Sequence, residues 1–202
     1  ADALRFDVVA FLNLGRDHLD FHRDMEEYFE AKASLFTPEH ARAAVVWIDD
    51  ENGCRVADRA RKAGLPVTTV GTREEADYRL MGYEPVLPLG GRARLRTASG
   101  ETTVELALPG WHNMVDAAIA LAMLERVGIS VKDVLPGLAR AQVPGRMQVL
   151  PLPEMAPTVV VDFAHTPQAV AATLDALQGF SEVITVVGCG GDRDPDKRPL
   201  MG

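Results

Sequence analysis

Short apolar runs alternate with segments of helical periodicity along this chain, and that alternation restricts the fold more than any other feature. The first 70 residues hold five such segments, namely apolar runs at 7–14, 43–48 and 66–70 and helical patterns over 24–36 and 51–63. Strands that alternate with helices in this way build βαβ units and a parallel sheet. We therefore predict an α/β protein with a mostly parallel sheet.

The segment 78–108 differs, because polar and apolar residues alternate there with a period of two. Arg92, Arg94 and Arg96 alternate with apolar neighbours, and Ser99-Gly100 has the composition of a turn. A period of two on both sides of a turn is typical of an antiparallel hairpin with one solvated face. We predict such a hairpin in addition to the parallel strands.

The rest of the chain predicts two further helices and then a second strand–helix–strand unit. The expected elements are helices at 111–127 and 131–141, a strand at 158–163, a helix at 167–178 and a strand at 183–188. The last of them is an unbroken apolar run that ends in glycine, which is typical of a strand buried on both faces. The segment 143–146 (VPGR) has the composition of a hinge, so we predict two domains, 1–144 and 145–202.

Composition excludes several classes of protein. The net charge of −8 argues against binding to nucleic acid or to an anionic membrane. No apolar stretch approaches the roughly 18 residues of a membrane-spanning helix, and the first residues do not form a signal peptide. Cys54 and Cys189 are the only cysteines, so the chain has no disulfide framework and no CxxC metal motif. We expect a cytoplasmic protein, and both ends of the sequence suggest a fragment of a longer one.

A polar loop follows the first predicted strand. Asn13 ends that strand, and His18 lies in the loop between Asp17 and Asp20. In open α/β sheets, ligands bind just outside the carboxyl ends of the strands. Imidazole is a common metal ligand and divalent cations prefer oxygen ligands, which makes His18 a candidate metal ligand. A single histidine in a loop is more often simply solvated.

Lys32 lies within an apolar stripe of the helix predicted over 24–36. Met25, Tyr28 and Leu35 share that stripe, since all four residues are spaced by three or four. The simpler interpretation is that the side chain buries its stem and extends its ammonium group into water. The alternative is a lysine held in a cleft, where a desolvated amine can react.

Two helix beginnings are candidate nucleotide sites. In the first, Asp162 ends a strand, and Thr166 and Pro167 suit the N-cap and first turn of the next helix. Such an N-terminus attracts an anion, and Asp162 could accept hydrogen bonds from ribose hydroxyls. In the second, Asn113 and Asp116 share one face of a first turn, where an amide can pair with a base edge. Simple helix capping is the alternative for the first pattern, and N-terminal capping explains the second equally well.

The loop after the last predicted strand combines glycine with positive charge. Gly190 and Gly191 allow close approach of the backbone to a ligand. Arg193 and Lys197 supply charge for a carboxylate or a phosphate. The alternative is a solvated polar turn.

Six motifs, in order along nearly the whole chain, resemble the Mur ligases, the ATP-dependent amide ligases of peptidoglycan assembly. They are NLGRDHLDFH, EEYFEAKASLF, LPGWHNMVDAAIA, VPGRMQVL, VVVDFAHTPQAV and GCGGDRDPDKRPLMG. The last is the most specific, and it is similar to the branch that adds a diamino acid to UDP-N-acetylmuramoyl-L-alanyl-D-glutamate. The resemblance implies the latter part of a P-loop-type central ATPase domain, followed by the start of a Rossmann-like C-terminal domain.

The resemblance also implies a role for each matching position. His18 would help to hold Mg²⁺, and Lys32 would react with CO₂ to form a carbamate that acts as a carboxylate-like metal ligand. The other implied contacts are Asn113 and Asp116 with adenine, Arg146 with ATP, Asp162 with ribose, His165 with ATP, Lys197 with a phosphate, Arg193 with a carboxylate of the diamino acid, and Asn13 with substrate.

The implied reaction transfers the γ-phosphate of ATP to a substrate carboxylate, and the amine of meso-diaminopimelate or L-lysine then attacks the acyl phosphate. The enzyme would be a monomer that serves cell-wall growth, cell shape and cell division. Sister ligases, such as cyanophycin or folylpolyglutamate synthetase, are an alternative within the superfamily. A non-catalytic nucleotide-binding module is an alternative from another class.

The sequence departs from the family pattern at several points. Asp116 stands where the family usually has asparagine, and Phe163 replaces a usual tyrosine. No GxxxxGK[ST] phosphate loop is present. We therefore expect these 202 residues to be inactive by themselves.

Overall fold

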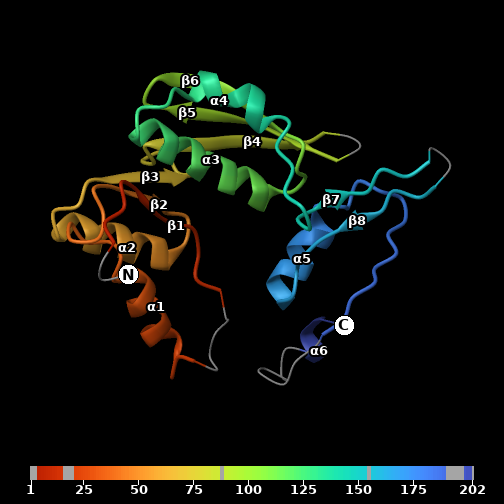
Figure 1. Ribbon diagram of the computed structural model, residues 1–202, viewed down its shortest axis with the longest axis horizontal. Coiled ribbons are helices and arrows are strands. Elements are labelled where there is room, and N and C mark those ends of the chain that lie inside the picture. The colour runs from red at the N-terminus through yellow and green to blue at the C-terminus, as the bar shows by residue number, and fades with distance from the viewer. Residues whose placement is uncertain (1–3, 16–20, 87–88, 154–155, 190–197, 202) are drawn as a thin grey trace.

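A computed structural model describes residues 4–15, 21–86, 89–153, 156–189 and 198–201 (Figure 1). Its elements, in chain order, are β1 (Val9–Phe11), α1 (Met25–Ala33), β2 (Ala44–Trp47), α2 (Glu51–Lys62), β3 (Val67–Gly71), β4 (Tyr78–Pro85), β5 (Gly91–Thr97), β6 (Gly100–Leu106), α3 (Trp111–Arg126), α4 (Val131–Leu138), β7 (Gln148–Val149), β8 (Val160–Val161), α5 (Pro167–Asp175) and α6 (Arg198–Met201).

The main sheet has six strands in the simple order β1-β2-β3-β4-β5-β6. The pairs from β1 to β4 are parallel, and β4, β5 and β6 pair antiparallel. This arrangement confirms the prediction of an α/β fold with a mostly parallel sheet and an antiparallel hairpin. It also adds a link that the sequence did not indicate, because β4 joins the parallel and antiparallel halves.

Helices cover both faces of this sheet, and strand β2 shows why. All four of its residues are buried. Val45 and Trp47 belong to the core that packs against α3, whereas Ala44 and Val46 belong to the core that packs against α1 and α2. A strand buried on both faces needs apolar residues at successive positions, and the sequence AVVW supplies them.

The antiparallel part has one solvated face, as predicted. Ala93 and Leu95 of β5 are buried in the core beneath α3, whereas Arg92 and Arg94 are exposed. Arg92 pairs across the hairpin with Glu105 of β6 at 2.8 Å. The period of two therefore separates core from solvent in this hairpin.

The helix predictions are confirmed within a few residues at each end. Asp24 caps α1 by accepting a hydrogen bond from the Glu27 N–H at 2.9 Å, and Asp50 caps α2 by accepting one from the Gly53 N–H at 3.0 Å. Gly64 has the positive φ of 82° that ends α2. Among the described residues, no helix is both long enough and apolar enough to cross a membrane.

The prediction of a buried strand at 183–188 is wrong. These residues have no regular secondary structure, and the side chains of Ile184 and Val186 are 84% and 96% exposed. The strand predicted at 158–163 shortens to β8, which pairs antiparallel with β7 instead of parallel with 183–188. An apolar run becomes a strand only where another backbone supplies hydrogen-bond partners, and the described residues supply none here.

Candidate active site

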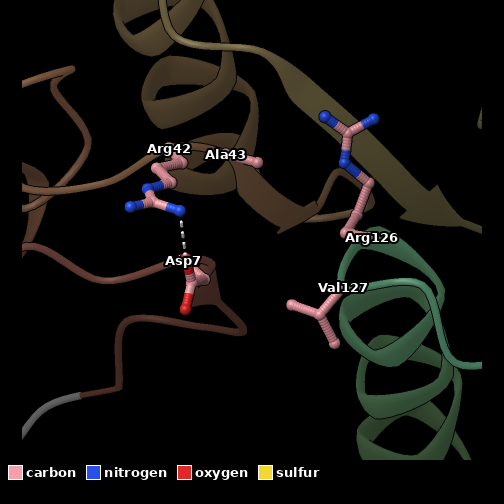
Figure 2. Close-up of a pocket in the computed structure, with 5 residues that line it drawn as sticks. All are labelled: Asp7, Arg42, Ala43, Arg126 and Val127. Atoms are coloured by element: carbon pink, nitrogen blue, oxygen red, sulfur yellow. Dashed lines mark ion pairs between the residues drawn. The ribbon is translucent and has the colours of Figure 1, made fainter.

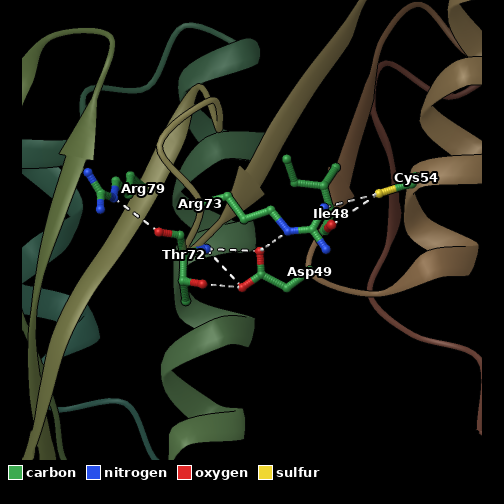
Figure 3. A network of polar contacts seen from close by, with 6 residues as sticks. All are labelled: Ile48, Asp49, Cys54, Thr72, Arg73 and Arg79. Atoms are coloured by element: carbon green, nitrogen blue, oxygen red, sulfur yellow. Dashed lines mark hydrogen bonds and ion pairs between the residues drawn. The ribbon is translucent and has the colours of Figure 1, made fainter.

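The carboxyl ends of β2 and β3 are tied together by a polar network (Figure 3). The Asp49 carboxylate, just after β2, accepts hydrogen bonds from the Thr72 N–H at 2.9 Å and from the Thr72 hydroxyl at 2.6 Å. Arg73 adds an ion pair to Asp49 at 3.8 Å. We did not single out these residues from the sequence, although their signal is simple: polar residues directly follow two apolar runs.

Lys32 lies at the carboxyl end of β1. Its Nζ atom is 3.5 Å from the main-chain carbonyl oxygen of Asn13 and 4.8 Å from the centre of the Tyr28 ring. The side chain is half-buried, so it lies at the margin of the buried face rather than at its centre. Two positions that the resemblance assigns to one site are therefore brought together, although it is the backbone of Asn13 that contacts the lysine.

Helix α1 is fixed to α2, and this contact sets the position of Lys32. Arg55 of α2 pairs with Glu26 and lies 3.9 Å from the centre of the Phe29 ring. Arg59 pairs with Glu30 at 2.5 Å. Phe29 itself is buried. The lysine thus projects from a helix that is held by both packing and charge.

Helix α3 begins at a tightly constrained turn. Gly110 has a φ of 99°, and its N–H donates to the Tyr83 hydroxyl at 2.8 Å. The Asn113 amide donates to the Pro109 carbonyl at 2.6 Å. In the described part of the chain, no side chain caps the N-terminus of α3 by a hydrogen bond, so Asn113 and Asp116 do not serve as hydrogen-bonding caps.

Asp116 lies one turn further along α3 with an exposed side chain. Desolvation by the surrounding helix and its neighbours nevertheless raises the pKa of its carboxyl, and nearby His112 opposes this shift. The environment of position 116 therefore disfavours a full negative charge. A neutral amide at this position would avoid that cost.

We expect Asp116→Asn to stabilise the protein near neutral pH by less than about 1 kcal/mol, because solvent screens an exposed group. A carboxyl whose pKa is raised on folding favours the folded state at low pH, and that contribution is lost as the pH rises through the raised pKa. Urea unfolding should therefore show a gain near neutral pH that disappears below the ordinary pKa of 3.8. An equal change at both pH values would contradict the desolvation argument.

The second predicted nucleotide site surrounds the start of α5. Thr166 caps this helix by accepting from the Ala169 N–H at 3.2 Å, as the capping interpretation predicted. The Arg146 guanidinium lies 4.8 Å from the centre of the Phe163 ring, and His165 Nδ1 lies 2.9 Å from the Phe163 carbonyl oxygen. Arg146, Phe163 and His165 are all exposed, so this cluster is accessible to a ligand.

The beginning of α3 lies against the end of α5. A Cβ atom added to Gly110 would lie 3.0 Å from the Cβ of Ala176, the C-cap residue that directly follows α5. The nine residues of α5 span roughly 14 Å. The Asn113 region and the Thr166 region therefore lie toward opposite ends of one short helix.

Three predicted site residues, His18, Arg193 and Lys197, lie outside the described residues, and their roles stay predictions.

Nowhere in the described ranges do three His, Cys, Asp or Glu side chains gather to hold a metal ion. Lys32 as an ammonium group repels a cation. The described residues therefore do not fit Mg²⁺ unless Lys32 carries a carbamate, whose oxygens are the ligands that Mg²⁺ prefers.

A hollow on the surface lies away from all these residues (Figure 2). It is lined by Asp7, Arg42 and Ala43, which precede β1 and β2, and by Arg126 and Val127 at the end of α3. Arg42 pairs with Asp7 at 3.0 Å on one side of it, and Arg126 and Val127 lie on the other side. Because ligands of open α/β sheets bind at the carboxyl ends of the strands, this hollow at the amino ends is not the candidate site.

Comparison with known proteins finds family matches over most of this chain. Residues 1–124 match the Mur ligase middle domain, and residues 145–202 match the Mur ligase, glutamate ligase domain. The UDP-N-acetylmuramoyl-L-alanyl-D-glutamate--2,6-diaminopimelate ligase of Corynebacterium efficiens is 44% identical over 98% of this chain and 38% of its own length. The protein of the same name from Thermosynechococcus vestitus is 40% identical over 98% of this chain and 40% of its own.

Solved structures give the same result. A UDP-N-acetylmuramoyl-L-alanyl-D-glutamate--2,6-diaminopimelate ligase superposes with a TM-score of 0.72 at 34% identity, over 96% of this chain and 40% of that one. MurF from Acinetobacter baumannii has a TM-score of 0.72 at 24% identity, over 84% of this chain and 37% of its own, and shares the fold. The chain thus spans about 40% of the length of its relatives. Because the middle-domain match covers more than half of it, the chain belongs to the Mur ligase family.

Proposed function

We propose that the intact protein is an ATP-dependent ligase that adds a diamino acid to UDP-N-acetylmuramoyl-L-alanyl-D-glutamate. The observation that carries this proposal is the contact between Lys32 and Asn13 at the carboxyl end of β1, where a site of this fold class is expected. We infer the reaction from the names of the relatives that match 98% of the chain. Because this chain spans less than half of those relatives, the proposal concerns the whole protein.

In the proposed reaction, the γ-phosphate of ATP passes to the substrate carboxylate and forms an acyl phosphate and ADP. The amine of the diamino acid then attacks the acyl carbon, loses a proton and displaces inorganic phosphate, which leaves an amide bond. Such chemistry depends mainly on positioning and on neutralising phosphate charge. Mg²⁺, bound with the help of His18 and a carbamate on Lys32, would supply part of that neutralisation.

The remaining side chains would bind and orient ATP. Asn113 would contact the adenine, and its amide needs only to turn from the Pro109 carbonyl that it now contacts. Arg146 would contact ATP from the exposed cluster with Phe163 and His165. Lys32 precedes the turn at 143–146, whereas Asp162 and His165 follow it, so closure about this turn would gate the reaction.

We propose 2,6-diaminopimelate as the diamino acid, because the relatives from Corynebacterium efficiens and Thermosynechococcus vestitus are named for it. L-Lysine is the alternative within the same reaction. Arg193 would meet a carboxylate of this substrate and Lys197 a phosphate. Folylpolyglutamate synthase shares the fold at 23% identity and adds no argument for a different substrate.

The proposal is tested by ADP release from the intact protein. We expect release only when ATP, UDP-N-acetylmuramoyl-L-alanyl-D-glutamate and meso-diaminopimelate are all present, with formation of one amide product. L-Lysine and L-glutamate in place of diaminopimelate are the matched controls. Turnover with a folate and glutamate, or ADP release that requires no diamino acid, would contradict the proposed function.

A further inference from the structure

The segment between the two predicted domains is a hydrogen-bonded turn rather than a loose connection. The Arg146 N–H donates to the Val143 carbonyl at 3.0 Å, across Pro144 and Gly145. Gly145 has a φ of 72°, as the third residue of a type II turn requires. Its N–H donates to the Gln148 side chain at 2.8 Å. The path of the chain is therefore well defined up to Arg146.

Met147, the next residue, has an unfavourable backbone conformation. Its φ of 44° is the only positive value at a non-glycine residue in the described ranges. Left-handed backbone brings Cβ too close to the following carbonyl, and methionine has no polar side chain to compensate. The side chain of Met147 is 1% exposed, so burial holds its outer end. A further interaction is needed to hold the backbone itself.

Asp162, in the loop directly after β8, supplies that interaction. One carboxylate oxygen accepts a hydrogen bond from the Met147 N–H at 2.8 Å. The other accepts from the Ala164 N–H at 2.8 Å and lies 3.2 Å from the Thr173 hydroxyl, whose single proton is shared with the Ala169 carbonyl at 3.0 Å. One carboxylate thus joins the linker, the loop before α5 and α5 itself, and hydrogen bonds to an ionised acceptor are the stronger kind.

We propose that Asp162 is a positioning residue that locks the linker in its left-handed conformation. The lock is the hydrogen bond from the Met147 N–H to the Asp162 carboxylate, and it fixes the backbone of Met147. Because Arg146 directly precedes Met147, the lock also holds the Arg146 guanidinium 4.8 Å from the centre of the Phe163 ring. The direction in which the chain enters its C-terminal part therefore depends on one side chain. This inference goes beyond the proposed function and does not depend on it, because it concerns the linker of the protein without any ligand.

The lock also limits what Asp162 can do for a nucleotide. A carboxylate offers about four acceptor positions, and two backbone N–H groups and the shared Thr173 hydroxyl already use up to three of them. A ribose hydroxyl could occupy the remaining position without breaking the lock. The ribose contact that the resemblance implies and the lock proposed here are thus separate roles with separate tests.

The test is hydrogen exchange measured by mass spectrometry on the intact protein, comparing Asp162→Asn with the wild type. The asparagine amide keeps the size of the side chain but cannot accept hydrogen bonds on both sides. We expect residues 145–148 to lose protection by about tenfold or more, because a bond to a charged acceptor is lost. The amides of β2 should change by less than about twofold, since they report only global unfolding.

Thr173→Val is the matched control, because it removes a different donor to the same carboxylate and leaves the Met147 bond in place. We expect it to leave protection of 145–148 unchanged. Unaltered protection of 145–148 in Asp162→Asn would overturn the proposal. An equal loss of protection in 145–148 and β2 would also overturn it, because it would show that Asp162 stabilises the whole protein rather than the linker.

Discussion

Replacing Lys32 with alanine in the intact protein should lower the rate of amide formation by at least about 100-fold, with little change in stability. Removing one group that stabilises charge in a transition state costs about two to three powers of ten. The side chain is half-buried, and within the described part of the chain its ammonium group contacts the Asn13 carbonyl and the Tyr28 ring. The measurement is steady-state release of phosphate together with a thermal unfolding curve.

Lys62→Ala is the matched control for this prediction, because Lys62 is a helical lysine that is exposed at the end of α2. It should keep full activity. A carbamate on Lys32 should also give a ¹³C NMR signal after exposure to ¹³CO₂ that is absent from Lys32→Ala. Near-normal turnover in Lys32→Ala would show that this lysine has no role in the reaction. Its side chain would then simply extend into solvent from the margin of the buried face.

The sequence predicts an element well wherever the local pattern of apolar residues determines which side chains are buried. The four apolar residues of β2 face two cores, and the alternating residues of β5 face one core and solvent. Both patterns are visible in the sequence because neighbouring positions carry the information. The run 183–188 is equally apolar, yet it is exposed. Its structure depends on a partner strand, and no local pattern reports whether that partner is present.

The candidate site shows the same difference between features that a local pattern predicts and features that depend on distant parts of the chain. Periodicity placed Lys32 near an apolar face, and it does lie at the edge of one, beside Asn13. The network of Asp49 with Thr72 and the bond from Met147 to Asp162 were not predicted. Each joins residues far apart in the chain, and hydrogen bonds of this kind follow from the fold rather than from spacing. Local reasoning therefore finds candidate side chains but not the contacts that hold them.

Gly53 provides the sharpest test of how tightly the fold is packed. This buried residue in the first turn of α2 follows the cap at Asp50, and no side chain fits at its position. An alanine Cβ would overlap the main-chain carbonyl oxygen of Trp47 and would lie 3.0 Å from its carbonyl carbon. These are backbone atoms of a central strand, so they cannot move aside as a flexible side chain would.

We therefore expect Gly53→Ala to reduce the free energy of unfolding by about 3 kcal/mol, at the upper end of the usual cost of overpacking. Gly137→Ala is the matched control, since Gly137 is also helical and has no atom within 4 Å of an added Cβ. It should stabilise the protein by up to about 1 kcal/mol through helix propensity. Urea unfolding followed by circular dichroism measures both. If both alanines stabilised the protein, then α2 would not pack against β2 as closely as described, and the position of α1 and Lys32 beside it would need to be revised.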